Sequence, residues 1–405
     1  MPMQDRRVEA AARLIVGAFC RGAYRLEVEG REHLPKDGPA VVVANHRSYI
    51  DPFVLGYALG RTPRFVTTVR VFRNPLTRWF CERMAAIPTR RGGADPRAVR
   101  EVLRTLEAGR LVAIFPEGER SWDGRSLPFM RGALRLLARL DVPVVPASLI
   151  GTYEAWPRWA PQPRLARLRV VFGPAIQPRC CGAEELGRRL TEAMHAPVAD
   201  AGPVRARAFG LARGLSRLLW WCPSCGEVGG LREASGERLE CAACGAGYRL
   251  DEHYRLSGPV SPSGSIARRP LAGWAGAGPP KLRPLEPSTA EAAWLQAGER
   301  VYLRAVATLL VGRWPDDVQV GEGRTALTDR RIHFVRRGRE RSLPTRSLST
   351  IVIEGPEILQ VGDRDRMWRL WLPGDSTLKW DVYLKALEDS GRGRGSGAAR
   401  RAGVG

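Results

Sequence analysis

Short apolar runs alternate with amphipathic stretches over the first 200 residues. Five runs have the length and β-branched content of buried strands, at 40–44, 64–69, 111–115, 144–150 and 168–172. Between and after them, apolar residues recur at helical spacing near 50–60, 76–84, 95–108, 131–139 and 183–195. Strand and helix in alternation predict an α/β domain over residues 24–200, with a mostly parallel sheet covered by helices.

Residues 1–23 form a separate amphipathic segment. Its apolar positions recur at helical spacing with arginines around them, namely Ala11, Leu14, Ile15, Ala18 and Phe19 among Arg6, Arg7, Arg13 and Arg21. Such a helix either lies on a membrane or packs on its own domain. The apolar stretch is too short for a secretory signal, and Phe19 is too large to precede a lipoprotein cysteine. We therefore expect a cytoplasmic chain with reduced cysteines, held at the inner face of the cell membrane.

The rest of the chain divides into segments of different character. In order, we expect a basic connecting helix at 201–221, a cysteine-bearing segment at 222–255, a Gly/Pro-rich linker at 256–287, a small strand-rich domain at 288–388 and a disordered basic tail at 389–405.

Length and composition exclude several classes. At roughly 150 residues per domain, the 405 residues suggest two or three domains. A chain that is 44% hydrophobic and 26% charged is globular, which excludes collagen-like, wholly disordered and disulfide-stapled proteins. No run approaches the ~18 apolar residues of a spanning helix, which excludes an integral multi-span protein.

The formal net charge of +22 predicts anionic partners. These include nucleic acid, an anionic membrane leaflet, and phosphorylated or CoA-like substrates. However, only four of the 64 basic residues are lysines, a bias that also fits codon composition. Single surface arginines therefore carry little weight.

Polar residues follow two of the predicted strands. Asn45 and His46 end the first run, and Asp51 comes five residues after the histidine. A histidine at the carboxyl end of a strand lies where open α/β sheets bind ligands. If the chain turns into a helix there, Asp51 can hydrogen-bond the imidazole and raise its basicity.

The strand at 111–115 leads into Pro116-Glu117-Gly118-Glu119-Arg120-Ser121. Gly118 lets the backbone approach a ligand, Arg120 can grip a phosphate, and Glu117 can accept hydrogen bonds from substrate hydroxyls. We expect this cluster and His46 to share one edge of the sheet.

Four ordered blocks over about residues 24–195 resemble the glycerolipid acyltransferase family typified by lysophosphatidic acid acyltransferases. The matching positions are His46 and Asp51, then Arg91 with Arg90 as a close alternative, then Glu117, Gly118, Arg120 and Ser121, then the proline block 142–146. Arg131 and Gly132 also match a helix start in the family, whereas Ala86 stands where many relatives have glycine.

The resemblance implies acyl transfer without a catalytic metal. His46, held by Asp51, would deprotonate an acceptor hydroxyl, which attacks the thioester of acyl-CoA or acyl carrier protein. Arg91 and Arg120 would neutralise the phosphate of a lysophospholipid, with 1-acylglycerol-3-phosphate the expected acceptor. Glu117, Gly118 and Ser121 would complete the substrate-binding set. Another lysolipid or an amine-bearing lipid is the alternative acceptor.

Cys222, Cys225, Cys241 and Cys244 form two C-x2-C pairs separated by fifteen residues. This spacing predicts a tetrahedral, structural zinc site that resembles a zinc ribbon. Two disulfides are the alternative in an oxidising compartment. The other cysteines, Cys20, Cys81, Cys180 and Cys181, lack such spacing.

The strand-rich domain resembles PH-like and GRAM-like barrels capped by a helix, most clearly over residues 323–334. Its role is either membrane or phosphoinositide binding, or protein contact and scaffolding. A non-catalytic protein that binds membrane or nucleic acid through the ribbon and this domain is the competing hypothesis. The ribbon lacks interleaved aromatic and basic residues, so we do not expect nucleic-acid binding.

Overall fold

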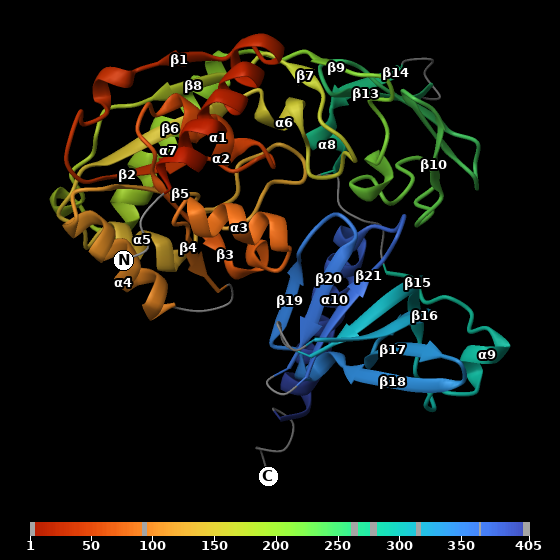
Figure 1. Ribbon diagram of the computed structural model, residues 1–405. Coiled ribbons are helices and arrows are strands. Elements are labelled where there is room, and N and C mark those ends of the chain that lie inside the picture. The colour runs from red at the N-terminus through yellow and green to blue at the C-terminus, as the bar shows by residue number, and fades with distance from the viewer. Residues whose placement is uncertain are drawn as a thin grey trace. The chain divides into compact units, whose positions relative to one another are not determined.

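The computed structural model describes residues 5–90, 95–260, 266–275, 282–312, 317–363 and 366–399 (Figure 1). The chain divides into two compact units. The first unit contains residues 1–213, 235–238 and 248–274, and the second contains 214–234, 239–247 and 275–405. Each unit is described by itself below.

A seven-stranded sheet forms the centre of the first unit, with strand order β1-β8-β6-β2-β5-β3-β4. The strands are β1 Glu27–Glu29, β2 Ala40–Ala44, β3 Arg64–Thr68, β4 Ile87–Thr89, β5 Leu111–Ile114, β6 Val144–Ile150 and β8 Arg169–Phe172. β2 pairs in parallel with both β5 and β6, so its five residues are buried on both faces. Only β8 runs against its neighbour β6, which confirms the mostly parallel α/β fold.

Helices cover both faces of this sheet (Figure 1). They are α1 Arg6–Ala18 with a π-helical turn Phe19–Ala23, α2 Asp51–Ala58, α3 Pro75–Arg83, α4 Pro96–Glu107, α5 Arg131–Leu137, α6 Thr152–Ala155 and α7 Ala183–Asp200. Successive residues of β2 point to opposite faces. Val42 accordingly joins the core that contains Leu55 of α2, whereas Val43 joins the core that contains Val102 of α4 and Leu190 of α7.

The expected connecting helix at 201–221 does not form. This stretch contains the short strand β9 (Ala206–Arg207), paired with β7 (Leu165–Ala166), and a 3-10 turn at Leu215–Arg217. Gly210 and Gly214 have φ values of 75° and 78°, in the left-handed region, which interrupts a helix.

The linker expected at 256–287 is folded over its first half. β13 (Arg255–Val260) pairs antiparallel with β12 (Gly247–Leu250) and β14 (Ile266–Pro270), and α8 (Leu271–Ala275) follows. Leu256 is fully buried, and the exposed fractions of Leu271 and Trp274 are 2% and 8%. The Gly and Pro content of this stretch led to the linker prediction. Its few apolar residues are nevertheless buried within the first unit. Residues 261–265 and 276–281 lie outside the described residues.

The second unit contains the cysteine knuckles, with β10 Leu231–Ser235 next to β11 Arg238–Cys241, and a larger antiparallel sheet. That sheet has the order β18-β17-β16-β15-β21-β20-β19. Its elements are α9 Thr289–Ala292, β15 Val301–Val311, β16 Val318–Thr328, β17 Arg331–Arg336, β18 Arg339–Pro344, β19 Thr350–Ile353, β20 Ile358–Gly362, β21 Met367–Trp371 and α10 Thr377–Ala399.

The expected barrel is not closed, because β18 and β19 end the strand order as the two edges of the sheet. The expected apolar helix is confirmed, since α10 buries Trp380, Tyr383 and Leu384. α10 is assigned through Ala399, within the tail where we expected disorder, and no proline interrupts residues 377–399. Residues 400–405 lie outside the described residues.

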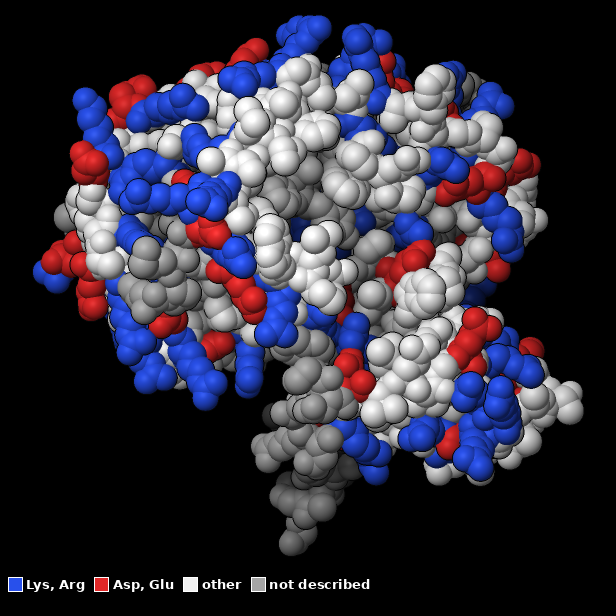
Figure 2. All heavy atoms as spheres, viewed as in Figure 1, with Lys and Arg blue, Asp and Glu red and all other residues white. Residues whose placement is uncertain are grey.

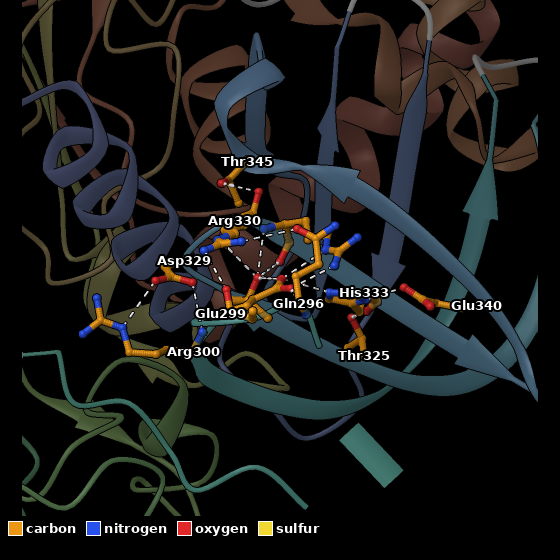
Figure 3. A network of polar contacts seen from close by, with 12 residues as sticks. Gln296, Glu299, Arg300, Thr325, Asp329, Arg330, His333, Glu340 and Thr345 are labelled. Atoms are coloured by element: carbon orange, nitrogen blue, oxygen red, sulfur yellow. Dashed lines mark hydrogen bonds and ion pairs between the residues drawn. The ribbon is translucent and has the colours of Figure 1, made fainter. Parts of the chain in front are cut away.

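A polar network crosses the larger sheet of the second unit (Figure 3). The His333 ring is fully buried, with Nδ1 2.7 Å from a Glu340 oxygen and Nε2 3.2 Å from a Glu299 oxygen. Burial by itself raises the pKa of Glu299. Hydrogen bonds from the side chains of Arg331, Thr328 and His333 and from the Gln296 N–H lower it to about 2. Its charged form therefore stabilises this unit above about pH 4.5, and the contribution is lost as pH falls towards 2.

Candidate active site

The two polar clusters expected at one sheet edge are brought together there. β2 and β5 are parallel neighbours, and His46 and Glu117 follow their carboxyl ends. Asn45 fixes the end of β2 against β6, because its side-chain amide donates to the Leu149 carbonyl at 3.0 Å and its oxygen accepts the Leu149 N–H at 2.7 Å.

His46 and Asp51 form the expected pair, with 2.8 Å between His46 Nδ1 and Asp51 Oδ2. Asp51 is fully buried at the first residue of α2, and the same oxygen accepts the N–H groups of Arg47 and Ser48 at 2.6 and 2.7 Å. An ionised carboxylate only accepts, so Nδ1 donates the proton and Nε2 carries the lone pair. The imidazole is therefore oriented and able to take a proton at Nε2.

Phe115 holds the other side of the imidazole. Its ring is stacked on His46, with ring centroids 4.3 Å apart and an interplanar angle of 20°. The His46 side chain is 15% exposed, and Phe115 covers one face of its ring. A ring held in this way keeps the direction of its basic nitrogen.

Glu117 is 5% exposed and holds two segments of backbone. One oxygen accepts the His46 N–H at 3.2 Å, and the other accepts the Leu127 N–H at 3.0 Å. Burial raises the pKa of Glu117 to about 7, against the lowering effect of the two backbone hydrogen bonds. Each oxygen of Glu117 thus accepts one backbone N–H, and each has a second lone pair, so the predicted contact with acceptor hydroxyls stays a prediction.

Gly118 and Ser121 shape the same loop. Gly118 has φ +70°, in the left-handed region that favours glycine. Ser121 is fully buried, donates its N–H to the His46 carbonyl at 3.1 Å, and accepts the Gly124 N–H through its hydroxyl at 3.0 Å. Ser121 thus fastens the loop to the end of β2.

Arg120 presents its guanidinium over an aromatic ring, with Cζ 3.8 Å from the centroid of Tyr49. Its Nε is buried and has no hydrogen-bond partner among the described residues. The Arg120 carbonyl accepts a hydrogen bond from Arg158 at 3.0 Å. A planar cation that is partly desolvated and stacked in this way is suited to bind a phosphate.

Arg91 lies outside the described residues. Its close alternative, Arg90, follows β4, and its N–H donates to Asp95 at 2.9 Å. Sequence reasoning missed Asn45, Tyr49, Phe115 and Arg158, which orient the site. Three of them stand within or beside the recognised blocks, whereas nothing near Arg158 in the sequence indicates its role.

The four cysteines predicted to bind zinc come together in the second unit, with their sulfur atoms all within 4.8 Å of one another. The Cys222–Cys244 and Cys225–Cys241 sulfur pairs are 3.8 and 3.7 Å apart. A tetrahedron with metal–sulfur bonds of about 2.3 Å has edges of about 3.8 Å, so the donor set fits zinc. The knuckles are equivalent: Gly226 donates to the Cys222 carbonyl and Gly245 to that of Cys241, both at 2.8 Å.

Residues 25–150 match the family model described as Acyltransferase. The chain is 37% identical over 139 residues to the 1-acyl-sn-glycerol-3-phosphate acyltransferase BAT2, chloroplastic, of Brassica napus, an alignment covering 33% of this chain and 40% of that protein. It is 27% identical over 144 residues to the 1-acyl-sn-glycerol-3-phosphate acyltransferase of Bacillus subtilis, covering 33% of this chain and 70% of that protein.

Among solved structures, the 1-acyl-sn-glycerophosphate acyltransferase PlsC of Thermotoga maritima aligns with 28% identity and a TM-score of 0.41, covering 49% of this chain and 83% of that one. The chain spans less than half of the length of the Brassica relative. The resemblance to the acyltransferase family is confirmed over the region that carries His46, Asp51 and Glu117.

The raised pKa of Glu117 predicts a pH-dependent cost of burying its charge. Because the folded pKa of about 7 exceeds the ordinary 4.5, the native state binds the extra proton, and stability falls as pH rises from about 4.5 to 7. The Glu117→Gln variant lacks this loss. Between pH 5 and pH 8, the stability of this variant relative to wild type should rise by about 2.5 kcal/mol. Denaturant unfolding at both pH values measures it.

Glu107→Gln, at an exposed carboxylate of α4, is the matched control and should follow wild type at both pH values. A Glu117→Gln variant whose stability parallels wild type from pH 5 to pH 8 would contradict the assignment.

Proposed function

We propose that the protein transfers an acyl group from the thioester of acyl-CoA or acyl carrier protein to the hydroxyl of a lysophospholipid, with 1-acylglycerol-3-phosphate the acceptor. The observation that carries the proposal is the oriented His46–Asp51 pair at the sheet edge, within the region that matches the Acyltransferase family. The names of the matched relatives support the choice of acceptor.

In this reaction His46 Nε2 takes the proton of the acceptor hydroxyl. The freed oxygen attacks the thioester carbonyl, the carbon–sulfur bond breaks, and the thiolate leaves with the proton returned from His46. Asp51 stabilises the imidazolium that forms between these steps, through the 2.8 Å contact with Nδ1. A thioester is already activated, so this route needs neither a covalent enzyme intermediate nor a catalytic metal.

We assign phosphate binding to Arg120 and Arg91. Arg120 supports the assignment by its partly buried guanidinium stacked on Tyr49, and Arg91 by its place in the arginine block alone. Besides the predicted substrate contacts, we assign Glu117 and Ser121 to holding residues 46 and 127 and the loop between the blocks. Gly118 permits the turn. Fixed groups of this kind lower the barrier by positioning rather than by direct chemistry.

Peripheral binding to an anionic membrane is the second part of the proposal. α1, α2 and α3 pack together: Arg83 forms an ion pair with Asp5 at 2.8 Å, and Phe53 lies 6.0 Å from Phe80 between ring centroids. Their outer surface, here called the apolar face, exposes large side chains of all three helices. We propose that six exposed side chains on these helices and on the turn after α1 make up the apolar face: Leu14, Ile15, Phe19, Phe53, Leu76 and Trp79.

Charge favours the same partner. Exposed Arg6 and Arg7 begin α1, the helix that carries the exposed Leu14 and Ile15, and a helix with both cationic and apolar exposed side chains suits an anionic interface. Elsewhere on the visible face, Lys and Arg side chains are spread among acidic ones rather than gathered in one patch (Figure 2). No helix in the described part of the chain has the length and hydropathy to cross a membrane.

We further propose that zinc holds the two cysteine knuckles. Cys222, Cys225, Cys241 and Cys244 would ligate it through four thiolates, and its role there would be structural. The sulfur separations and the equivalent glycine turns support this assignment over two disulfides.

The acyl-transfer proposal predicts that His46→Ala lowers transfer from radiolabelled acyl-CoA to lysophosphatidic acid by about 10³-fold, because the base is lost. Asp51→Asn should lower it by at least about 100-fold, since the tautomer is no longer fixed. His195→Ala, at an exposed histidine of α7, should leave the rate unchanged. Equal rates for wild type and His46→Ala would place the site elsewhere. Failure of wild type with both donors and a lysolipid panel would refute acyl transfer.

The membrane proposal predicts that Leu14→Glu combined with Leu76→Glu weakens sedimentation with vesicles containing anionic phospholipid at least tenfold. These side chains are 70% and 73% exposed, so their loss removes membrane contact rather than core packing. The control carries the same changes at Leu103 on α4 and Leu165 on β7, both outside the apolar face. Equal vesicle binding by the two double variants would argue against this surface.

The zinc proposal predicts one zinc per purified chain by elemental analysis. Cys222→Ser with Cys244→Ser should abolish binding and lower the unfolding temperature of the second unit, because metal binding contributes folding free energy. Cys81→Ser, a cysteine outside the cluster, is the control. If the four cysteines form two disulfides, or if the chain is fully folded without metal, the zinc proposal is wrong.

A further inference from the structure

A buried aromatic cluster joins residues 248–274 to the acyltransferase region within the first unit. Tyr254, which follows β12, is 4% exposed, and Arg164 is equally buried. Around them lie Trp159, which is fully buried, and Tyr153 of α6. None of these side chains takes part in the proposed chemistry, and Tyr254 stands outside the stretch matched by the family model.

The direction of the Tyr254 side chain is fixed by its own turn. Its φ is +54°, a left-handed conformation that a tyrosine keeps only when its surroundings over-determine it. Asp251 supplies that constraint, since it accepts the N–H groups of His253 and Arg255 at 2.9 Å each and forms an ion pair with Arg268 at 2.5 Å.

Arg164 locks the ring from the other side. Its guanidinium lies over Trp159 at 4.6 Å and over Tyr254 at 5.3 Å from the ring centroids. It donates to the Tyr254 hydroxyl and, at 2.6 Å, to the Leu211 carbonyl. The Tyr254 hydroxyl in turn donates to the Glu154 carbonyl at 2.9 Å. Both hydrogen-bonding roles of this hydroxyl are therefore filled.

Contacts continue from Tyr254 to the loop that follows β5. The Tyr153 ring meets Tyr254 edge-on, 5.7 Å between centroids, and the Tyr153 hydroxyl donates to the Trp122 carbonyl at 3.0 Å. An added Cβ at Gly124 would lie 2.8 Å from the Tyr153 ring, so the loop and the ring are in close contact.

The loop is held at two further points. Arg158, 1% exposed, lies over the Trp122 ring at 4.6 Å and donates to the Arg120 carbonyl at 3.0 Å. Arg125 donates to the Ala272 carbonyl of α8 at 2.6 Å. The segment 248–274 thus reaches the loop through its own backbone as well as through the aromatic cluster.

We propose that Tyr254 is a positioning residue for Arg120: the cluster of Tyr254, Arg164, Tyr153 and Trp122 sets the place of the guanidinium that binds the acceptor phosphate. The inference rests on the proposed function in its assignment of Arg120. It gives the segment beyond the family region a part in acceptor recognition, because a phosphate site depends on where its cation is held.

The experiment compares Tyr254→Leu and Tyr254→Phe with Tyr248→Leu. Tyr248 is buried in β12 against Trp274, so its change removes a similar ring from the same segment. Hydrogen exchange of residues 118–128 is followed by mass spectrometry. In parallel, KM is measured for lysophosphatidic acid and for an uncharged monoacylglycerol.

For Tyr254→Leu we expect at least fivefold faster exchange in residues 118–128, with the α4 amides at their wild-type rates. KM for lysophosphatidic acid should rise about tenfold, with a smaller change in kcat and in KM for monoacylglycerol. Tyr254→Phe keeps the ring and should show the same effects in weaker form. Tyr248→Leu should show neither.

Unchanged exchange in residues 118–128 of a folded Tyr254→Leu variant overturns the proposal, as does an equal effect in Tyr248→Leu. If Tyr254→Leu does not fold, Tyr254→Phe decides, and wild-type exchange in it overturns the proposal. Faster exchange with KM rising equally for both acceptors refutes the link to the phosphate. If wild type transfers no acyl group, exchange still tests the support of the loop, and the proposed function alone fails.

Discussion

Two buried carboxylates take the backbone N–H groups that the sheet leaves unpaired where β2 ends. The N–H of His46 donates to Glu117, and those of Arg47 and Ser48 donate to Asp51. Unpaired backbone donors in a buried site are costly, so these three contacts set the path of the chain from strand to helix. The same Asp51 oxygen orients the imidazole, so one carboxylate serves both the local fold and the chemistry.

Contacts between the two strand ends make the block of His46 and Asp51 depend on the block of Glu117 and Ser121. Glu117 follows β5. Its oxygens accept the N–H of His46, which follows β2, and the N–H of Leu127. Ser121 returns from that loop to the His46 carbonyl. The backbone of His46 is thus held by contacts from the segment that follows the neighbouring strand. Burial disfavours the charged form of Glu117 and so raises its pKa.

Elsewhere the chain uses buried charge in a different way. In the second unit, Glu299 accepts hydrogen bonds from Arg331, Thr328 and His333, which lower its pKa although burial opposes this. The donors around Glu299 keep its carboxylate ionised, and the charged form stabilises the sheet. Glu117 accepts hydrogen bonds from backbone N–H groups, and its pKa is raised. Burial raises the pKa of both carboxyls, and at Glu299 the side-chain donors outweigh it.

The sequence by itself determined the α/β order, the pairing of His46 with Asp51 and the cysteine set, because each depends on short-range spacing. Apolar periodicity predicts strands and helices locally, and H-x-x-x-x-D or C-x2-C brings its members together within one turn. The linker and the connecting helix were wrong because both segments were judged by composition. Within the linker, Trp274 packs on Tyr248 and donates to the Leu256 carbonyl, so the burial of its few apolar residues folds the segment.

Only the tertiary structure shows which backbone groups the polar side chains of the two blocks hold. The sequence predicts Glu117 and Ser121 as substrate-binding residues, and the structure adds that Glu117 accepts the His46 N–H and Ser121 the Gly124 N–H. Arg158 and Tyr254 carry no signal, since their contacts join segments far apart in the chain. Spacing along the sequence cannot encode such contacts, because the fold alone brings these segments within hydrogen-bonding distance.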